Sequence, residues 1–176
     1  MSTLFSSEAI SCQKDIQVEL TSSGYCQEPF KISFAHPSHI EGAKKLADAN
    51  RTIFGFITRR AFLDAYEAGT LIVVTRYDEV VGFLRYHHRK RDLQTTLYDI
   101  CVAKAERGKH LGQGMLHMLI DGCRNSGRAT ILLKCPSHLA ANAFYENNGF
   151  FCVDTLAGKH QRLNVWCLDL TSRGQQ

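Results

Sequence analysis

One stretch of the chain, Thr95–Asn125, limits the possible folds more than any other. A strand is predicted over Thr95–Val102, a glycine-rich basic turn follows it, and an amphipathic helix is predicted over Gly112–Arg124. The apolar residues of that helix recur at helical spacing and share one face: Met115, Leu116, Leu119, Ile120 and Cys123. A strand leading directly into such a helix is the unit that brings parallel strands into one sheet. We therefore expect a mixed α/β fold.

The remaining elements follow from hydrophobic periodicity and turn residues. A second strand-then-helix unit is expected over Thr130–Phe150. Three successive strands in the middle of the chain are compatible with a meander, and Asp78-Glu79 supplies the first turn between them. The predicted strands outside Thr95–Val102 are Phe30–Phe34, Thr70–Tyr77, Val80–His88, Thr130–Cys135, Phe150–Val153 and Leu163–Leu170.

Capping signals set the expected helix boundaries. Ser38 and Glu41 have the spacing of a capping box, so the first helix is expected to begin there. A second helix is expected over Arg59–Ala68, and Ser137 is expected to cap the last one. The stretch Asn50–Thr58 is expected to be irregular.

Length and composition fit one globular domain. The chain has 176 residues, of which 44% are hydrophobic and 22% charged, which excludes fibrous and disordered classes. Residues 1–28 are interpreted as an extension in which Ile16–Leu20 alternates as a peripheral strand would, 29–172 as the domain, and 173–176 as a tail. No apolar run reaches the ~20 residues that cross a bilayer, and no signal-peptide core is present, so a cytoplasmic location is expected.

The cysteines and the charge narrow the function classes. The chain has 7 Cys, an odd number, and no C-x-x-C pair, so neither a zinc knuckle nor a dithiol centre is expected. The 8 His show no ligand spacing, and no metal site is expected. We interpret the cysteines as buried, reduced thiols. A net charge of +4 falls short of a dedicated nucleic-acid binder.

The turn between Val102 and Leu116 has the chemistry of an anion site. The first turn of a helix presents unpaired N–H groups and a partial positive charge. Glycines let a phosphate approach the backbone closely, and Arg107 and Lys109 add charge. The alternative is a glycine-containing loop whose basic residues are solvated and bind no anion. Because neither G-x-G-x-x-G nor G-x-x-x-x-G-K-[ST] occurs, the pyrophosphate of some other cofactor is the expected ligand.

Two motifs carry a resemblance to a known family. Arg107–Gly114 resembles the acyl-coenzyme A signature Q/R-x-x-G-x-G/A of the GCN5-related N-acetyltransferases (GNAT family), although His110 stands where the family has its first glycine. Ala141–Phe150 resembles the family's A-x-x-F-Y-x-x-x-G-F segment beside the pantetheine arm, and His138 stands where the family often has Asn. The resemblance covers nearly the whole chain, Phe30–Leu170.

The resemblance implies a fold and an activity. The expected fold is a single-domain mixed sheet of about six to seven strands, splayed between strands four and five and flanked by about four helices. The expected enzyme transfers an acetyl group from acetyl-coenzyme A to a primary amine, by direct attack in a ternary complex and without a metal. The expected partner is a small-molecule or peptide amine, with no membrane or nucleic acid, and a homodimer is left open.

The resemblance also implies site residues. Tyr145 stands at the position of the family's acid, and Asp99 near that of acidic residues in small-amine members. Direct transfer needs no cysteine nucleophile. The implied cofactor-binding residues lie on the fourth strand, the turn and the last helix: Ile100, Cys101, Val102, Arg107, Gly108, Lys109, His110, Leu111, Gly112, Gln113, Gly114, His138 and Asn142.

Alternatives stay open for three of these side chains. Tyr145 could pack beneath the cofactor instead of donating a proton. Asp99 could be a base, an ammonium anchor or a structural carboxylate. His138 could bond the pantetheine arm or cap the helix.

The sequence indicates the chemistry of the amine acceptor only through the charge of the segments expected to bind it. The segments Asn50–Arg60 and Ala157–Arg162 correspond to the family's acceptor-binding parts, and their basic residues would favour an acceptor with a carboxylate or phosphate over a polyamine. The basic run Arg85–Arg91 is interpreted as a solvated face, with an acceptor rim or phosphate contacts as alternatives. The competing functions are a catalytically silent acyl-coenzyme A sensor or interaction module and a nucleic-acid-directed enzyme.

Overall fold

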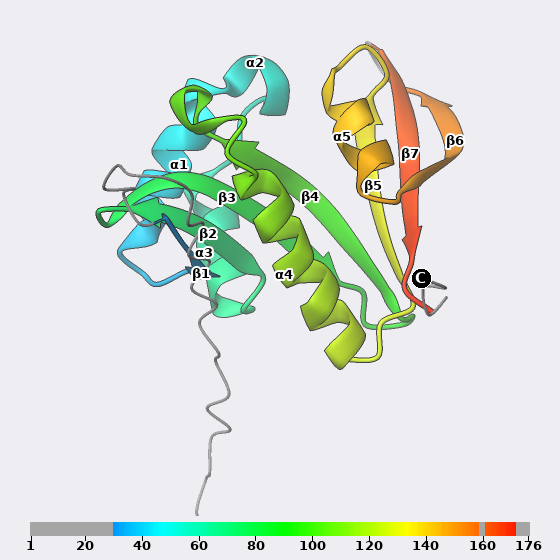
Figure 1. Cartoon of the computed structure of the whole chain (residues 1–176), viewed down its shortest axis with the longest axis horizontal. Coiled ribbons are helices and arrows are strands. Elements are labelled where there is room, and N and C mark those ends of the chain that lie inside the picture. The colour runs from blue at the N-terminus through cyan, green and yellow to red at the C-terminus, as the bar shows by residue number, and fades with distance from the viewer. Residues whose placement is uncertain (1–29, 159–160, 172–176) are drawn as a thin grey trace, which may run out of the picture.

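A seven-stranded mixed sheet forms the centre of the protein (Figure 1). The computed structural model describes residues 30–158 and 161–171. The elements in chain order are β1 (Phe30–Phe34), α1 (His39–Ala49), α2 (Arg51–Phe54), α3 (Arg59–Glu67), β2 (Leu71–Arg76), β3 (Glu79–His88), β4 (Gln94–Val102), η1 (Lys104–Glu106), α4 (Leu111–Asn125), β5 (Thr130–Pro136), α5 (Ala141–Asn147), β6 (Phe151–Ala157) and β7 (Arg162–Asp169). The expected single-domain α/β fold is confirmed, with one α-helix more than the expected four in the described residues.

The sheet has the order β1-β2-β3-β4-β5-β7-β6. Strands β2, β3 and β4 form the expected meander, and their first turn lies at Tyr77 and Asp78, with φ of 47° and 63°. That turn is one residue earlier than predicted, and two successive left-handed residues suit the twist of a hairpin. The first strand–helix unit joins β4 to a parallel β5. In the second unit β7 inserts between β5 and β6 and is antiparallel to both.

Helices cover both faces of the sheet. Helices α4 and α5 lie on one face and α1 and α3 on the other (Figure 1). Alternation along the strands divides the side chains between two cores, so that Ile72 faces α4 while Val73 faces α1 and α3. The apolar face predicted for α4 is buried in the first core. In the second core the rings of Phe62 and Phe83 pack edge to face at 5.3 Å.

Two capping predictions are wrong. Ser38 has helical dihedrals, its side chain makes no capping hydrogen bond, and its hydroxyl lies 3.1 Å from Nδ1 of His36. Glu41, the other half of the expected capping box, pairs with Arg59. Ser137 lies in the turn after β5, and α5 begins only at Ala141 with no side-chain cap. Competing local hydrogen bonds of this kind leave a capping residue with another partner.

The segment expected to be irregular contains a helix. Within Asn50–Thr58, α2 forms one short turn and ends at Gly55, whose φ of 69° and ψ of −149° only glycine adopts readily. The expected second helix is confirmed as α3, which Thr58 caps by accepting from the N–H of Ala61 at 3.2 Å.

Strands β4 and β5 separate after a short paired segment. Gln94–Thr96 pairs with Thr130–Leu132, and within the described residues Leu97–Val102 has no strand partner on its β5 side. Figure 1 shows the two strands meeting at one end and diverging toward α2 and α5. The splay that the family resemblance implies between the fourth and fifth strands is therefore confirmed.

Some expectations fall outside the described residues, and one is corrected. The extension 1–28 with Ile16–Leu20 and the tail 173–176 are not among the described residues. Cys101, Cys123 and Cys135 are buried as expected, but Cys167 is only partly buried and Cys152 is exposed. Cys152 lies on the edge strand β6, whose residues are all exposed. No helix in the described part of the chain combines the length and apolarity needed to span a membrane.

Candidate active site

The end of β4 directs backbone N–H groups into the opening beside β5. The N–H of Ala103 donates to the carbonyl of Val81 at 2.8 Å, on the β3 side. Because successive residues of a strand alternate in the direction of their N–H and C=O groups, Ile100 and Val102 direct theirs to the side from which β5 has separated. Two of the three residues predicted on this strand therefore offer hydrogen-bond donors to the opening.

Cys101, the third predicted residue, faces away. Its side chain lies in the core under α1 and α3, beside Val73 and Phe83. Burial raises the pKa of Cys101 to about 11, with Arg107 acting in the opposite direction. A thiol with such a pKa stays protonated at neutral pH, so its chemistry is that of a packing residue.

The turn after β4 presents free backbone donors at the start of α4. The N–H of Gly114 donates to the carbonyl of His110 at 2.9 Å, which is the first bond of the helix. The N–H groups of Leu111, Gly112 and Gln113 precede that bond and have no acceptor within the helix. The backbone geometry on which the anion-site prediction depends is therefore present.

The two predicted cations of the turn bond to the protein itself. Arg107 donates from Nε to the carbonyl of Val102 at 3.1 Å and from Nη2 to Oδ1 of Asn50 at 3.3 Å. Lys109 lies with its Nζ 2.6 Å from Oε2 of Glu106. These bonds tie the turn to β4 and to the connection between α1 and α2. Contact of either cation with phosphate stays a prediction.

Glu106 is a residue of the site that the sequence prediction missed. Its side chain is 8% exposed and accepts from Arg76 at 2.8 Å as well as from Lys109. The hydrogen bond from Lys109, together with the charges of both cations, lowers the pKa of Glu106 against the opposing effect of burial. The sequence signal that could have identified Glu106 is a single acidic residue within an otherwise basic turn. Its function in the fold is to anchor the turn to β2.

His110 adopts a left-handed conformation just before α4. Its φ is 57° and its ψ is 11°. A side chain in this region costs roughly 1–2 kcal/mol, whereas glycine adopts it freely, which gives a physical reason for the family's glycine at this position. The imidazole is exposed, and its Nδ1 lies 3.2 Å from Oε1 of Gln113.

Tyr145 lies on the opposite side of the opening from β4. Its side chain is buried among the rings of Phe144, Phe150 and Trp166. Burial raises the pKa of Tyr145 well above its ordinary value, and the charges of Cys135 and Asp99 act in the same direction. The hydroxyl therefore stays protonated at every physiological pH, as a proton donor must.

Asp99 faces the side of the sheet that carries α1 and α3. It forms an ion pair with Arg85 on β3, and both side chains are largely buried. Burial raises the pKa of Asp99, while the charge and hydrogen bonds of Arg85 lower it. The interpretation of Arg85–Arg91 as a solvated face is thus wrong for Arg85, and also for the buried Tyr86, since both belong to a central strand.

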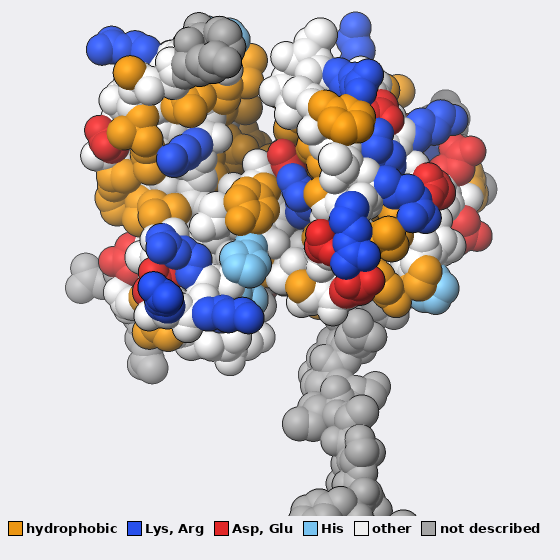
Figure 2. Space-filling view, turned by 180° about the vertical axis from the view of Figure 1, so that it is seen from behind, with side chains coloured by type: hydrophobic (Ala, Val, Ile, Leu, Met, Phe, Trp, Pro, Cys, Tyr) orange, Lys and Arg blue, Asp and Glu red, His pale blue; other side chains and the backbone are white. Residues whose placement is uncertain are grey.

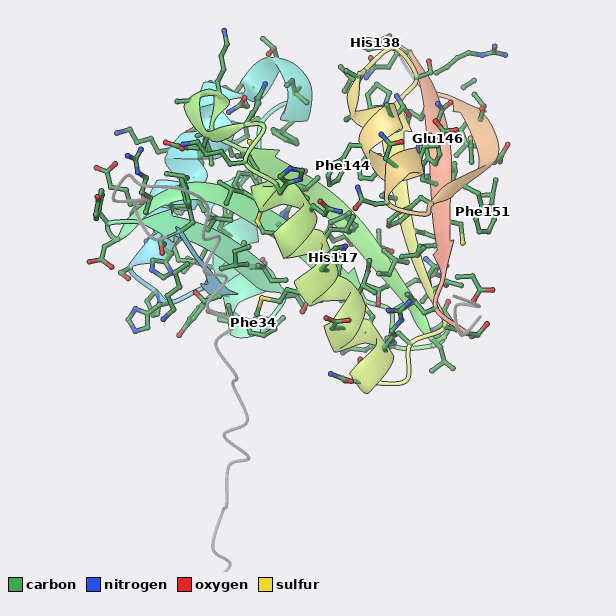
Figure 3. The ribbon with its side chains drawn as sticks, in the orientation of Figure 1. Phe34, His117, His138, Phe144, Glu146 and Phe151 are labelled. Carbon is green, nitrogen blue, oxygen red and sulfur yellow. The ribbon has the colours of Figure 1, made fainter. Side chains whose placement is uncertain are left out.

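The last two cofactor-side candidates differ in their surroundings. Asn142 accepts from Trp166 Nε1 at 2.9 Å and from Asn164 at 3.1 Å, and its amide donates to the carbonyls of Pro136 and Leu139. Its polar atoms are therefore engaged within the protein. His138 is exposed in the turn after β5 (Figure 3). The alternative that it caps α5 is wrong, because Ala140 precedes that helix without any side-chain cap.

The basic residues of the first predicted acceptor-side segment, Asn50–Arg60, are paired with acids. Arg51 pairs with Asp48, Arg59 with Glu41, and Arg60 with both Asp64 and Glu67. On the face seen in Figure 2, acidic and basic side chains intermingle over the half of the molecule that carries α1–α3. These ion pairs do not support an electropositive rim over Asn50–Arg60. In the second segment, Ala157–Arg162, Lys159 and His160 lie outside the described residues.

A cleft separates the two halves of the molecule. Figure 2 shows the surface hollowed between the half built on β1–β4 and the half built on β5–β7. From α5 the ring of Phe144 extends toward the first turn of α4 (Figure 3). Ile100 and Val102 on β4 and Tyr145 on α5 belong to the two halves on opposite sides of this cleft. No metal-binding group of His, Cys, Asp or Glu occurs in residues 30–158 and 161–171.

A sheet splayed beside such a helix N-terminus is the architecture of acetyltransferases. The sequence model of the Acetyltransferase (GNAT) family matches residues 40–150. The chain belongs to this family. A comparison with curated protein sequences finds no match.

Solved structures support the same fold. Ard1 from Thermoplasma volcanium superposes with a TM-score of 0.72 at 19% identity, over 80% of this chain and 97% of that one. The ribosomal-protein-S18-alanine N-acetyltransferase from Escherichia coli gives 0.68 at 19% identity, over 84% and 97%. The putative acetyltransferase yncA from Salmonella typhimurium, solved with acetyl-CoA, gives 0.68 at 20% identity, over 84% and 97%.

Proposed function

We propose that this protein is an N-acetyltransferase that moves the acetyl group of acetyl-coenzyme A to a primary amine by direct attack in a ternary complex. The single observation that carries the proposal is the pair of N–H groups of Ile100 and Val102, on the part of β4 that does not pair with β5. Preorganised N–H donors stabilise the negative charge that a carbonyl oxygen gains in acyl transfer. Acetyl-coenzyme A supplies the thioester.

The turn fits the acyl donor. The three N–H groups of Leu111, Gly112 and Gln113 at the start of α4 are the donors for its pyrophosphate. Gly112 places no side chain beside these N–H groups, and Gly108, with a φ of 80°, allows the chain to bend before them. The glycines and amides of the turn fit a pyrophosphate better than Arg107 and Lys109 do, because both cations already bond to the protein.

Two side chains complete the chemistry. Tyr145 donates a proton to the departing thiolate, and its buried, protonated hydroxyl suits that role. Asp99 accepts the proton of the incoming ammonium from the face that carries α1 and α3. Acetyl-coenzyme A and the amine that receives the acetyl group therefore enter the opening from opposite faces of the sheet.

The acceptor is a primary amine of a peptide or a small molecule. Among the structural neighbours, one is a ribosomal-protein-S18-alanine N-acetyltransferase and another an aminoglycoside 6'-N-acetyltransferase. The ion pairs of Arg51, Arg59 and Arg60 weaken the reason to favour an acidic acceptor. Both amine classes belong in the test.

The test is a panel of peptide and small-molecule amines with acetyl-coenzyme A, followed by release of free thiol and by mass spectrometry of the product. We expect thiol release that depends on the amine, with the acceptor gaining one acetyl group. Tight binding of acetyl-coenzyme A without thiol release across the panel would support the silent sensor instead. No binding of acetyl-coenzyme A would reject both functions.

A further inference from the structure

Arg85 holds the carboxylate of Asp99 by one oxygen. The two residues face each other across the antiparallel pair of β3 and β4. Nε of Arg85 lies 2.8 Å from Oδ2 of Asp99, and Nη2 lies 2.6 Å from the same oxygen. Within the described residues, Oδ1 of Asp99 receives no hydrogen bond. One carboxylate oxygen is therefore fixed, and the other is left for a ligand.

The guanidinium of Arg85 is itself held between two rings. It lies 5.8 Å from the centroid of Phe62 on α3 and 5.4 Å from that of Tyr98. The side chains of Arg85 and Asp99 are 18% and 12% exposed. Few rotamers are open to an arginine that is stacked and ion-paired in this way, so Asp99 is held in one orientation.

A bulge in β4 creates this arrangement. Arg85 pairs with Asp99 and the next residue, Tyr86, pairs with Leu97, so Tyr98 is left without a partner in the register. Bulges redirect side chains and are frequent beside active sites. Here the extra residue brings the ring of Tyr98 over Arg85, and Asp99 follows just where β4 has separated from β5.

We propose that Arg85 is a positioning residue for acyl transfer: it holds Asp99 by Oδ2 and leaves Oδ1 to take the proton of the acceptor amine. The inference rests on the proposed function. The N–H bond of the ammonium breaks, an O–H bond forms on Oδ1, and the freed nitrogen lone pair attacks the thioester carbon. The thiolate leaves with the electrons of the C–S bond and takes its proton from Tyr145. The nitrogen loses its second proton as the amide forms, and that proton returns Tyr145 to its neutral state.

The titratable side chains that interact electrostatically with Asp99 lie on three elements. Arg85 lies on β3, Cys101 on β4 and Tyr145 on α5, and the charge of Asp99 raises the pKa of both Cys101 and Tyr145. Burial raises the pKa of Asp99, and only Arg85 opposes it among the causes identified. Loss of the arginine charge leaves burial unopposed, so the pKa of Asp99 rises further. More of the carboxylate is then protonated at a given pH.

The test compares Arg85→Gln, which removes the charge, with Arg85→Lys, which keeps it but loses the two-point contact. In Arg85→Gln we expect the acid limb of kcat/KM, and the Asp99 carboxyl resonance in an NMR titration, to move up by about 1–3 pH units. In Arg85→Lys we expect little movement of either, with a lower kcat at every pH. The KM for acetyl-coenzyme A should be unchanged in both.

Three controls make the test specific. Calorimetric binding of acetyl-coenzyme A shows that each variant is folded. Arg124→Gln, an exposed change at the far end of α4, should match the wild type in its acid limb and in the Asp99 resonance. In an Asp99→Asn background, Arg85→Gln should cause no further loss, because both changes act through one carboxylate. A further loss of equal size in that background would overturn the proposal.

The outcomes separate this proposal from the proposed function. An unmoved acid limb in an active Arg85→Gln enzyme overturns the role of Arg85 alone. A wild type that binds acetyl-coenzyme A but acetylates no amine overturns the proposed function, even where the Asp99 resonance shifts as expected.

Discussion

The ring of Phe144 on α5 lies against Gly112 in the first turn of α4. A Cβ on Gly112 would sit 3.7 Å from two atoms of that ring and 3.8 Å from Cγ2 of Val102. These are ordinary van der Waals distances, so a methyl group fits without displacing its neighbours. The same methyl group would stand among the backbone N–H groups proposed to receive the pyrophosphate.

Gly112→Ala should therefore raise the stability of the protein and lower its affinity for acetyl-coenzyme A. Alanine within a helix is favoured over glycine by roughly 0.5–1 kcal/mol, so the melting temperature should rise. Affinity for acetyl-coenzyme A should fall by about tenfold, a loss of ~1.4 kcal/mol, because the phosphate is kept away from the backbone. Thermal denaturation and titration calorimetry measure the two effects. Gly122→Ala, in open space on the same helix, should gain stability with unchanged affinity. Equal affinity in both variants would remove the turn as the pyrophosphate site.

His110 offers a test of backbone strain. With a φ of 57°, the residue costs roughly 1–2 kcal/mol that glycine does not, so His110→Gly should stabilise the protein by about 1 kcal/mol. His110→Ala keeps the backbone cost and removes only the imidazole, so it should bring no such gain. Chemical denaturation measures both. Acetyl-coenzyme A affinity should be retained in each variant, and a marked loss would show that the imidazole contacts the cofactor.

The backbone of the site was predictable because its signals are local. The spacing of Met115 and Leu119 fixes the buried face of α4, and the glycines after Arg107 mark the turn before it. Two local motifs therefore located the strand, turn and helix. Ser38 and Ser137 show the limit of capping signals, since the Ser38 hydroxyl lies beside His36 instead of capping α1, and α5 begins only at Ala141.

The partners of the site's side chains depend on contacts between distant parts of the chain. Glu106 meets Arg76 from β2, Arg107 meets Asn50 from the end of α1, and Asp99 meets Arg85 through a register that a bulge shifts. No pattern in one segment specifies such pairs. On the acceptor side only the pair of Arg59 with Glu41 is of this kind, whereas Arg51 and Arg60 pair with acids of their own or the adjoining helix at spacings visible in the sequence.

Glu106→Gln should destabilise the fold in a pH-dependent way. Loss of the charged acceptor weakens the bonds from Arg76 and Lys109, at about 1–2 kcal/mol. Because the folded-state pKa of Glu106 is lowered, its stabilisation is full above the ordinary value of 4.5 and is lost as pH falls through the folded-state pKa. The difference from wild type in urea denaturation should thus be present at neutral pH and shrink in acid. Asp121→Asn, an exposed change on α4, should show no such difference. A deficit that persists unchanged in acid would contradict the ion-pair explanation.

Tyr145→Phe should remove turnover while sparing binding. Loss of a general acid lowers kcat by roughly 10²–10⁴. The Tyr145 hydroxyl makes no hydrogen bond within the described residues, so its loss should leave stability and acetyl-coenzyme A affinity nearly unchanged. Since the pKa of Tyr145 is raised, the wild type should show no alkaline loss of kcat from this group up to pH 10. Stopped-flow thiol release over a pH series measures this, and turnover equal to wild type would exclude Tyr145 as the acid.

Asn142 should prove structural, because its side chain joins the turn after β5 to β7. Asn142→Ala leaves the indole N–H of Trp166 and the amide of Asn164 without their acceptor, at about 1–3 kcal/mol for the buried indole N–H. The chain has 1 Trp, so intrinsic fluorescence reports on this residue alone, and its emission should shift in the folded variant. Asn147→Ala, an exposed change on the same helix, should leave both fluorescence and stability as in wild type. If Asn142→Ala lost affinity for acetyl-coenzyme A with no change in stability or fluorescence, the side chain would instead contact the cofactor directly.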